Sequence, residues 1–339
     1  MDERHYILRA SSVEELLSRQ REIPDISNYA FKRYFLTDAE AECKLLPDEP
    51  GAVSYIQQPP LDGGTVAVWV YVTSGAEVIR EGRDTLVNAG DFQLHFTAGM
   101  VAPGPDSSVQ TRRILEDYSA LLSSKSLTLA DNCLRTWFFC RDIDDRYAGL
   151  VEARREFFDS VGLTRETHYL ASTGIAGLSP TPGALVQMDA LAVSGCFSQT
   201  YLHGSTHLNP TWEYGVTFER GVKASFGGRA HTLISGTASI DNKGSVLHVG
   251  DIVSQTRRMI ENVEVLLREA GTGWGSVQQI LVYLRNASDY EAVAPIFERE
   301  LPGIPRLILL APVCRPDWLI EMECMALDPT LPARGQRPQ

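Results

Sequence analysis

Short runs of β-branched and aromatic residues dominate the chain from residue 52 to residue 96, and Gly, Pro and Asp separate them. Runs of this length, bounded by turn residues, are typical of β-strands. No stretch with helical periodicity interrupts them, so we expect an antiparallel sheet without an intervening helix. The predicted strands cover residues 52–56, 65–72, 76–80 and 91–96. The preceding fifty residues are mixed, although Ser12, followed by Glu15, is typical of a capped helix start.

In the rest of the chain, apolar residues recur at helical spacing between further runs that are typical of strands. One series of elements is predicted up to residue 193, and a second series with the same alternation of strands and helices begins near residue 230. The first series comprises helices over 107–122 and 147–161 and strands over 134–140, 168–172 and 184–193. The second comprises strands over 230–240, 279–284, 306–311 and 319–326 and helices over 253–270 and 289–300.

The two series also match in sequence. Residues 110–116 (QTRRILE) match residues 255–261 (QTRRMIE), and residues 185–192 (LVQMDALA) match residues 319–326 (LIEMECMA). Two copies of one unit predict two domains of one fold. In this alignment Glu321 stands where the central copy has Gln187. The expected domains are a strand-rich N-terminal domain over 1–88, a central domain over 89–204 and a C-terminal domain over 205–339.

Composition and charge restrict the classes of function. With 339 residues, 44% hydrophobic and 22% charged, the chain has the length for two or three domains and the composition of an ordinary globular protein. Its net charge of −12 argues against non-specific binding of nucleic acid and provides no attraction to anionic membranes. An anionic substrate would therefore have to be held by local Arg side chains.

Other sequence patterns bear on location and on metals. The N-terminal residues lack the basic and apolar pattern of a signal peptide, and the longest apolar runs, such as 65–72, are too short to cross a bilayer. The six cysteines include no CxxC pair, which predicts reduced thiols in a cytoplasmic protein. The seven histidines show no metal-ligand spacing, so the sequence implies no metal.

The last predicted strand, over 319–326, is apolar except for Glu321 and Glu323. Alternation along a strand puts both carboxyl groups on one face. Burial and a like-charged neighbour both favour the protonated form, and a carboxylic acid that stays neutral near pH 7 can donate a proton to a substrate. The alternative is that one Glu pairs with an Arg while the other reaches solvent at the strand end. For Glu323 both roles stay open: raising the pKa of Glu321, or ion pairing with a neighbouring Arg.

Several motifs, taken in order, resemble known families. Residues 234–238, 250–257 and 282–285, with Arg306 fifteen residues before Glu321, resemble the YjgF/RidA superfamily, whose single domains form trimers. The chain as a whole, over residues 50 to 328, is similar to the chorismatases, which resemble three such domains fused in one chain. The motifs that carry this second resemblance are Arg135–Trp137, Thr173–Ile175, Tyr214–Gly215, Phe218–Arg220, Ser235–Ala238 and Leu319–Glu321. The first fifty residues match neither pattern.

The resemblance implies an α+β fold, a pseudo-trimeric arrangement of YjgF/RidA-like (chorismate-mutase-like) domains in which helices cover one face of each β-sheet. It places the active site in the cleft between the central and C-terminal domains, where Glu321 would protonate the enol-ether methylene of chorismate without a cofactor. Family members that hydrolyse chorismate have Ala-like residues at the positions of Gly236 and Cys314, whereas those that form 3-hydroxybenzoate have Gly and Cys. The chain therefore resembles the 3-hydroxybenzoate-forming type, a monomer that supplies an aromatic starter acid for a secondary metabolite.

Chorismate carries two carboxylates, and Arg binds carboxylates through bidentate contacts. Arg220, Arg306 and Arg135 lie in or beside apolar strands, so they are the candidates for substrate binding. A structural salt bridge is an equally frequent role for each of them. Tyr214 is a further candidate for substrate contact, and a core aromatic with a hydrogen-bonded hydroxyl is its alternative.

Two further candidates are a cysteine and a glycine. A free Cys is most often a small buried apolar residue, and a Gly within a strand often marks a bulge. Under the resemblance, Cys314 belongs to the catalytic site, where it shapes the pocket or steers an intermediate, and Gly236 leaves room for the substrate ring. Two other functions stay open: a hydrolytic chorismatase giving a dihydroxy-cyclohexadiene carboxylate and pyruvate, or a YjgF/RidA-like imine deaminase or ligand-binding protein.

Overall fold

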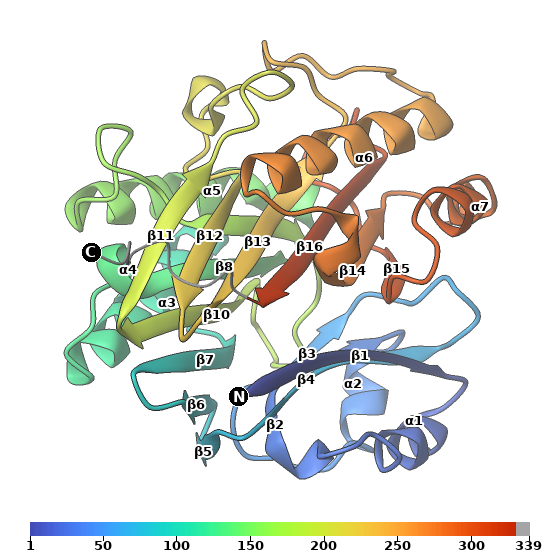
Figure 1. The fold of residues 1–339 in the computed structure, drawn as a ribbon. Helices are drawn as coiled ribbons and strands as arrows, with labels where there is room; N and C mark the ends of the chain where they lie inside the picture. The colour runs from blue at the N-terminus through green and yellow to red at the C-terminus, as the bar shows by residue number, and fades with distance from the viewer. Residues whose placement is uncertain (330–339) are drawn as a thin grey trace, which may run out of the picture.

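The structure, a computed structural model, describes residues 1–329 and contains three β-sheets (Figure 1). The first sheet has the strand order β1-β4-β2-β3. Its strands are β1 (Asp2–Ala10), β2 (Tyr29–Leu36), β3 (Val53–Gln57) and β4 (Val66–Ser74), and its helices are α1 (Val13–Gln20) and α2 (Ala39–Cys43). The predicted helix start is confirmed, because the Ser12 side chain accepts a hydrogen bond from the Glu15 amide.

The sequence pattern predicts neither β1 nor β2. β1 is mostly polar, and it is held by antiparallel pairing with β4 along its whole length. β2 contains Lys32 and Arg33, and both side chains are buried. Each has an acidic partner, Glu49 for Lys32 and Asp189 for Arg33. Charges that are typical of a loop in the sequence therefore lie inside the sheet because tertiary contacts neutralise them.

The second and third sheets share one topology, with orders β5-β6-β7-β10-β8-β9 and β11-β12-β13-β16-β14-β15. The second sheet consists of β5 (Glu77–Glu81), β6 (Asp84–Asn88), β7 (Phe92–Met100), β8 (Cys133–Cys140), β9 (Ala171–Ala176) and β10 (Val186–Gly195). The third consists of β11 (Phe197–Leu202), β12 (Gly221–Phe226), β13 (Arg229–Ala238), β14 (Val277–Leu284), β15 (Arg306–Leu310) and β16 (Ile320–Pro329). Their helices are α3 (Ser107–Ser124), α4 (Leu129–Asn132), α5 (Ile143–Ser160), α6 (Ile252–Glu269) and α7 (Tyr290–Glu300). Among residues 1–329, no helix is long and apolar enough to cross a membrane.

The internal repeat is visible in the strand pairing and extends to the first sheet. Each sheet has one inner strand with an antiparallel neighbour on either side, and one of these neighbours pairs in parallel with the strand at the sheet edge. The inner strands are β4, β10 and β16. Glu321 on β16 pairs with Tyr283, and Gln187 on β10 pairs with Phe139. The equivalent residue on β4 is Ala67. Only one of the three repeats therefore has an acid at this position.

The expected single antiparallel sheet over residues 52–96 is wrong. β3 and β4 belong to the first sheet, whereas β5 and β7 belong to the second, and β3 runs parallel to β2. A strand's sequence shows its length and faces but not its partner, which depends here on contacts far away in the chain. The sheets change between Ser74 and Glu77 and again between Gly195 and Phe197. We therefore propose domain limits near 75 and 196, in place of the limits after 88 and 204 that the sequence suggests.

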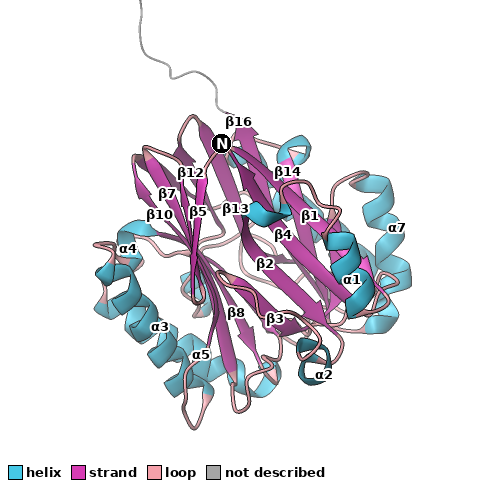
Figure 2. Cartoon of the chain, turned by 90° about the horizontal axis from the view of Figure 1, so that it is seen from below, coloured by secondary structure: helices cyan, strands magenta, loops and turns pink. Residues whose placement is uncertain are grey.

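The three sheets pack together in the middle of the molecule, and the helices lie on the outside (Figure 2). One hydrophobic cluster contains residues of all three sheets, among them Phe31, Trp137 and Leu233. The rings of Trp69 and Trp137, from the first and second sheets, lie 6.1 Å apart. A core shared by three repeats in one chain is the arrangement expected of a pseudo-trimer.

Candidate active site

A cavity of about 420 Å³ lies between the second and third sheets and their connecting segments. The central part of the chain contributes residues of α5 and β9, and the C-terminal part contributes β13, the start of β16 and two loops. Five of the predicted site residues line it: Tyr214, Arg220, Gly236, Cys314 and Glu321. The cavity thus occupies the cleft in which the resemblance places the active site.

Glu321 lies near the start of β16 with only 4% of its surface exposed. Its carboxyl group reaches Gly236 on β13, where a Cβ atom would lie 2.1 Å from Oε1. Burial, and then the nearby charge of Glu323, raise the pKa of Glu321 to about 8, although Arg135 and Arg220 act in the opposite direction. A buried carboxyl with this pKa holds its proton at neutral pH and can act as a general acid.

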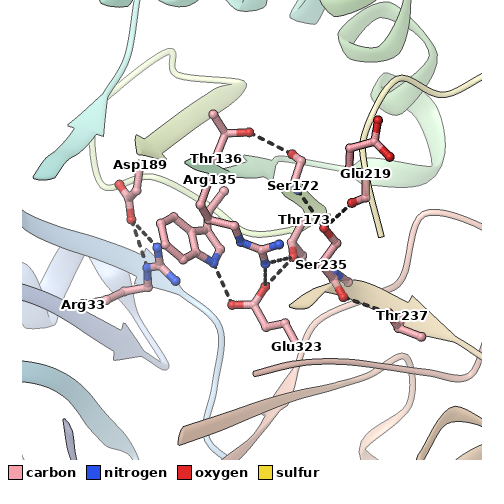
Figure 3. Close-up of polar contacts among 12 residues, drawn as sticks. Arg33, Arg135, Thr136, Ser172, Thr173, Asp189, Glu219, Ser235, Thr237 and Glu323 are labelled. Atoms are coloured by element: carbon pink, nitrogen blue, oxygen red, sulfur yellow. Dashed lines mark hydrogen bonds and ion pairs between the residues drawn. The ribbon is translucent and has the colours of Figure 1, made fainter. Parts of the chain in front are cut away.

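Glu323 is also buried, but its surroundings differ (Figure 3). Its two oxygens accept hydrogen bonds from Arg135 Nη2 at 2.8 Å, from Trp137 Nε1 at 2.8 Å and from the Thr173 hydroxyl. Three donors, one of them cationic, stabilise a carboxylate. The two acids of one strand face therefore lie in different surroundings: Glu323 is paired with Arg135 and two further donors, whereas burial favours the neutral form of Glu321.

Arg220 and Tyr214 form one wall of the cavity. The Arg220 guanidinium is buried and donates to the backbone oxygen of Asn209 from Nη2 at 2.9 Å. It lies over the ring of Tyr214, with 5.3 Å from Cζ to the ring centroid. The Tyr214 hydroxyl is buried and has no hydrogen-bond partner among residues 1–329. Both side chains are thus fixed by the protein while their polar ends face a space that a substrate could fill.

Two of the predicted arginines lie away from the cavity wall. Arg135 is fully buried, and its ion pair with Glu323 is the structural role that the sequence left open. Arg306 lies on β15, next to the N-terminal part of the chain, where Arg9 donates to its backbone oxygen. Its own guanidinium donates to the Leu301 oxygen at 3.2 Å. The expectation that Arg306 and Arg135 line the substrate site therefore has no support in this cavity, because neither side chain faces it.

Arg154 and Tyr147 on α5 line the cavity but were not among the predicted site residues. Arg154 is buried, and its Nε and Nη2 have no hydrogen-bond partner among residues 1–329. Unpaired buried donors of a charged group are costly unless a ligand satisfies them. A sequence signal exists: Arg154 lies four residues after Leu150 and three before Phe157, so a charge stands on the apolar stripe of the helix.

Cys314 lies in the loop before β16. Burial, and then the charge of Glu321, raise the pKa of its thiol to about 12. The thiolate, which is the nucleophilic form, is therefore not populated at neutral pH. Cys314 can shape the cavity, as the resemblance implies, but it is not built as a nucleophile. Within residues 1–329, no group of three His, Cys, Asp or Glu side chains lies close enough together to hold a metal ion.

Comparison with known proteins places this geometry in a family. Residues 225–328 match the family model described as Endoribonuclease L-PSP. RutC from Acinetobacter baylyi, a 3-aminoacrylate deaminase, is 33% identical over 97 residues, which cover 27% of this chain and 75% of RutC. The chain belongs to the RutC family. Because the match to this RutC covers only 27% of the chain, it describes about one repeat rather than the whole molecule.

Two further comparisons cover most of the chain. A 3-hydroxybenzoate synthase from Streptomyces hygroscopicus is 27% identical over 285 residues, covering 76% of this chain and 79% of that protein. A crystal structure of a chorismatase matches with a TM-score of 0.72 at 18% identity, over 96% of this chain and 99% of the other, which shows a shared fold. The predicted relationship to the chorismatases and to the YjgF/RidA superfamily is confirmed, as is the pseudo-trimeric α+β fold.

Proposed function

We propose that the protein is a chorismatase that converts chorismate to 3-hydroxybenzoate and pyruvate. The observation that carries the proposal is Glu321, a neutral acid buried at the wall of a cavity that also contains the arginines 154 and 220. A dianionic substrate with an acid-labile bond requires both features. The similarity to a 3-hydroxybenzoate synthase supports the same substrate.

The chemistry begins with proton transfer. An enol ether is cleaved after protonation at its methylene carbon, which gives an oxocarbenium ion, and Glu321 is the side chain placed to give this proton. Exclusion of water strengthens the electrostatic contacts in such a site. 3-Hydroxybenzoate and pyruvate together contain the atoms of chorismate, so no water is consumed overall. The proposed route is an internal rearrangement of the protonated intermediate, which satisfies this balance without addition and later loss of a water molecule.

Substrate binding is assigned to groups with unsatisfied donors. Arg154 offers Nε and Nη2, and the Tyr214 hydroxyl and Trp318 Nε1 are likewise buried without a partner among residues 1–329. A carboxylate in the cavity could accept from Arg154 and a second could approach Arg220. A cavity of about 420 Å³ also falls within the usual range of roughly 300–1,000 Å³ for small-molecule sites.

Gly236 and Cys314 support the 3-hydroxybenzoate outcome over the hydrolytic outcome. Both line the cavity, and both are the residues that the resemblance associates with the first product. We further propose that the protein acts as a cytoplasmic monomer, because one chain already contains three repeats around a shared core. The proposed context is the supply of an aromatic starter acid for a secondary metabolite.

A single assay distinguishes the candidate functions. The protein is mixed with chorismate, and pyruvate and the aromatic product are followed by chromatography and absorbance. Pyruvate together with 3-hydroxybenzoate is the expected result. Pyruvate with a dihydroxy-cyclohexadiene carboxylate would instead identify a hydrolytic chorismatase. Absence of pyruvate at any pH would overturn the proposal and favour an imine deaminase or a ligand-binding protein, as the similarity to RutC allows.

A further inference from the structure

We infer that Glu323 is a positioning residue for the acid: its carboxylate, held by the central part of the chain, keeps the neighbouring Glu321 carboxyl protonated and directed at the cavity. This inference rests on the proposed function, since it takes Glu321 as the proton donor. Glu323 itself does not line the cavity, so it would act through Glu321 rather than on the substrate.

Glu323 is fixed from across a domain boundary. Its donors, Arg135, Trp137 and Thr173, lie on β8 and β9, whereas Glu323 lies on β16. Figure 3 shows the Arg135 guanidinium pointing at this carboxylate. Three donors from a different sheet hold the charge at a constant place relative to the cavity. By contrast, no hydrogen bond acts on the Glu321 carboxyl among residues 1–329.

Several charged or titratable groups surround Glu321. The charged or titratable groups that act on it are Glu323 on β16, Arg135 on β8, Arg220 before β12, Tyr283 on β14, Tyr147 on α5 and Cys314 in the loop before β16. The cavity wall also contains Asp144, Glu152, Arg154, Arg155, Tyr214 and Arg315. Burial raises the pKa of Tyr283, Tyr147 and Cys314, so these three stay neutral near pH 7. Glu323 is therefore the buried anion whose charge favours retention of the proton on Glu321, whereas the acids Asp144 and Glu152 of the cavity wall are exposed.

Thr173 connects the charge with the position of the acid. Its hydroxyl donates to Glu323 and accepts the Gly236 amide at 2.9 Å. Gly236 is also the residue against which the Glu321 carboxyl lies. The Thr173 hydroxyl thus links the Glu323 carboxylate to the backbone of Gly236. The Glu321 carboxyl lies against that same backbone.

The central repeat provides an internal comparison. Asp189 on β10 is the equivalent of Glu323, and it forms a fully buried ion pair with Arg33 from the first sheet, with 2.8 Å between Nη2 and Oδ2 (Figure 3). The residue two places earlier is Gln187, whose amide donates to Ser54 Oγ at 3.0 Å. An Arg–acid pair between sheets therefore occurs twice, but only one of the pairs adjoins an acid. If the Arg135–Glu323 pair had only a structural role, loss of the acid should have the same effect in either pair.

The test compares the pH dependence of pyruvate release from chorismate in the wild type, Glu323→Gln and Asp189→Asn. Removing the Glu323 charge leaves Arg135 uncompensated, and both changes favour ionised Glu321. The high-pH limb of kcat should therefore move to lower pH by about one unit or more in Glu323→Gln. Asp189→Asn should lose comparable stability and keep the limb of the wild type. An unmoved limb in a folded Glu323→Gln protein would overturn the inference.

Two further measurements apply if Glu323→Gln fails to fold or if the protein does not convert chorismate. The Arg135→Met, Glu323→Gln double variant removes both charges of the pair. Its limb should lie between those of the wild type and Glu323→Gln, because the Glu323 charge outweighs that of Arg135 at Glu321. Difference infrared titration without substrate follows the protonated carboxyl band that disappears in Glu321→Gln. Loss of this band at lower pH in the Glu323 variants supports the inference even if pyruvate release fails, whereas an unchanged band overturns it.

Discussion

Gly236 and Glu321 lie so close that a Cβ atom on residue 236 would be 2.1 Å from Oε1 and 2.9 Å from Cδ of the acid. A side chain on residue 236 and the Glu321 carboxyl in its present place would therefore overlap. The absence of a side chain at 236 therefore does more than enlarge the cavity: it lets the carboxyl lie against β13. The place from which the proton is delivered depends on this glycine.

The first prediction concerns the acid. Glu321→Gln should fold, because Gln187 occupies the equivalent position of the central repeat. It should lose most pyruvate release from chorismate, since general acid catalysis typically contributes ~10²–10⁴-fold to a rate. Glu152→Gln is the matched control, because Glu152 is an exposed acid that lines the same cavity. Retention of more than about a tenth of the wild-type rate in Glu321→Gln would exclude it as the proton donor.

The second prediction concerns the arginines. Arg154→Met and Arg220→Met keep much of the side-chain volume and remove the charge. Each should raise KM for chorismate roughly 10- to 150-fold, corresponding to the loss of a charge-assisted hydrogen bond of about 1.5–3 kcal/mol. Arg306→Met is the control and should leave KM unchanged, because Arg306 lies outside the cavity. If the Arg306 variant shows the larger effect, the substrate occupies a different cleft.

The third prediction concerns stability and pH. The pKa of Glu321 is about 8 in the folded protein, against an ordinary value of 4.5. Between these values the folded protein retains a proton that the unfolded chain has released, so this residue lowers the free energy of unfolding as pH rises from 4.5 to 8. The slope from this group is at most ~1.4 kcal/mol per pH unit.

Glu321→Gln has no such titration, so its stability should exceed that of the wild type by an amount that grows across this window. Denaturant unfolding at pH 5, 6, 7 and 8 measures the difference. A constant difference between the two proteins would mean that Glu321 ionises near its ordinary pKa.

The repeat and the strand that carries the acid could be predicted from sequence because each leaves a trace in the letters, whereas Gly236 is indicated as a site residue only by the family resemblance. Matching letters at 185–192 and 319–326 identify equivalent strands, and an apolar run around Glu321 indicates burial. The central position of β10 and β16 in their sheets follows the same equivalence. Each of these features can be read within a short segment or by comparing two segments of the sequence.

The partners of the charges could not be predicted, since they depend on how the sheets meet. Arg306 and Arg154 show this contrast. Arg306 lies in a strand beside a family motif, yet that strand faces the N-terminal part of the chain, where Leu61 donates its amide to Ile308. Arg154 belongs to no motif, but α5 brings it to the cavity. Sequence shows that a charge is buried, whereas tertiary structure decides what it contacts.

The last prediction concerns product choice. Cys314→Ala changes the space in the cavity and leaves the Glu321 carboxyl where it is. Gly236→Ala must also displace that carboxyl. Since that carboxyl is the far end of a flexible side chain, it can move, and the variant should stay folded. Turnover should therefore fall more in Gly236→Ala than in Cys314→Ala.

Both variants, and the double variant most, should shift the products from 3-hydroxybenzoate toward the dihydroxy-cyclohexadiene carboxylate, because water gains access to the intermediate before it rearranges. Chromatographic product ratios at equal chorismate consumption measure the shift, and ¹⁸O-water identifies the product that has captured solvent. Pyruvate yield per chorismate should stay the same, since both outcomes follow one protonation. An unchanged ratio with continued turnover would show that the partition depends on other groups of the cavity wall, of which Tyr147 and Trp318 are the next to vary.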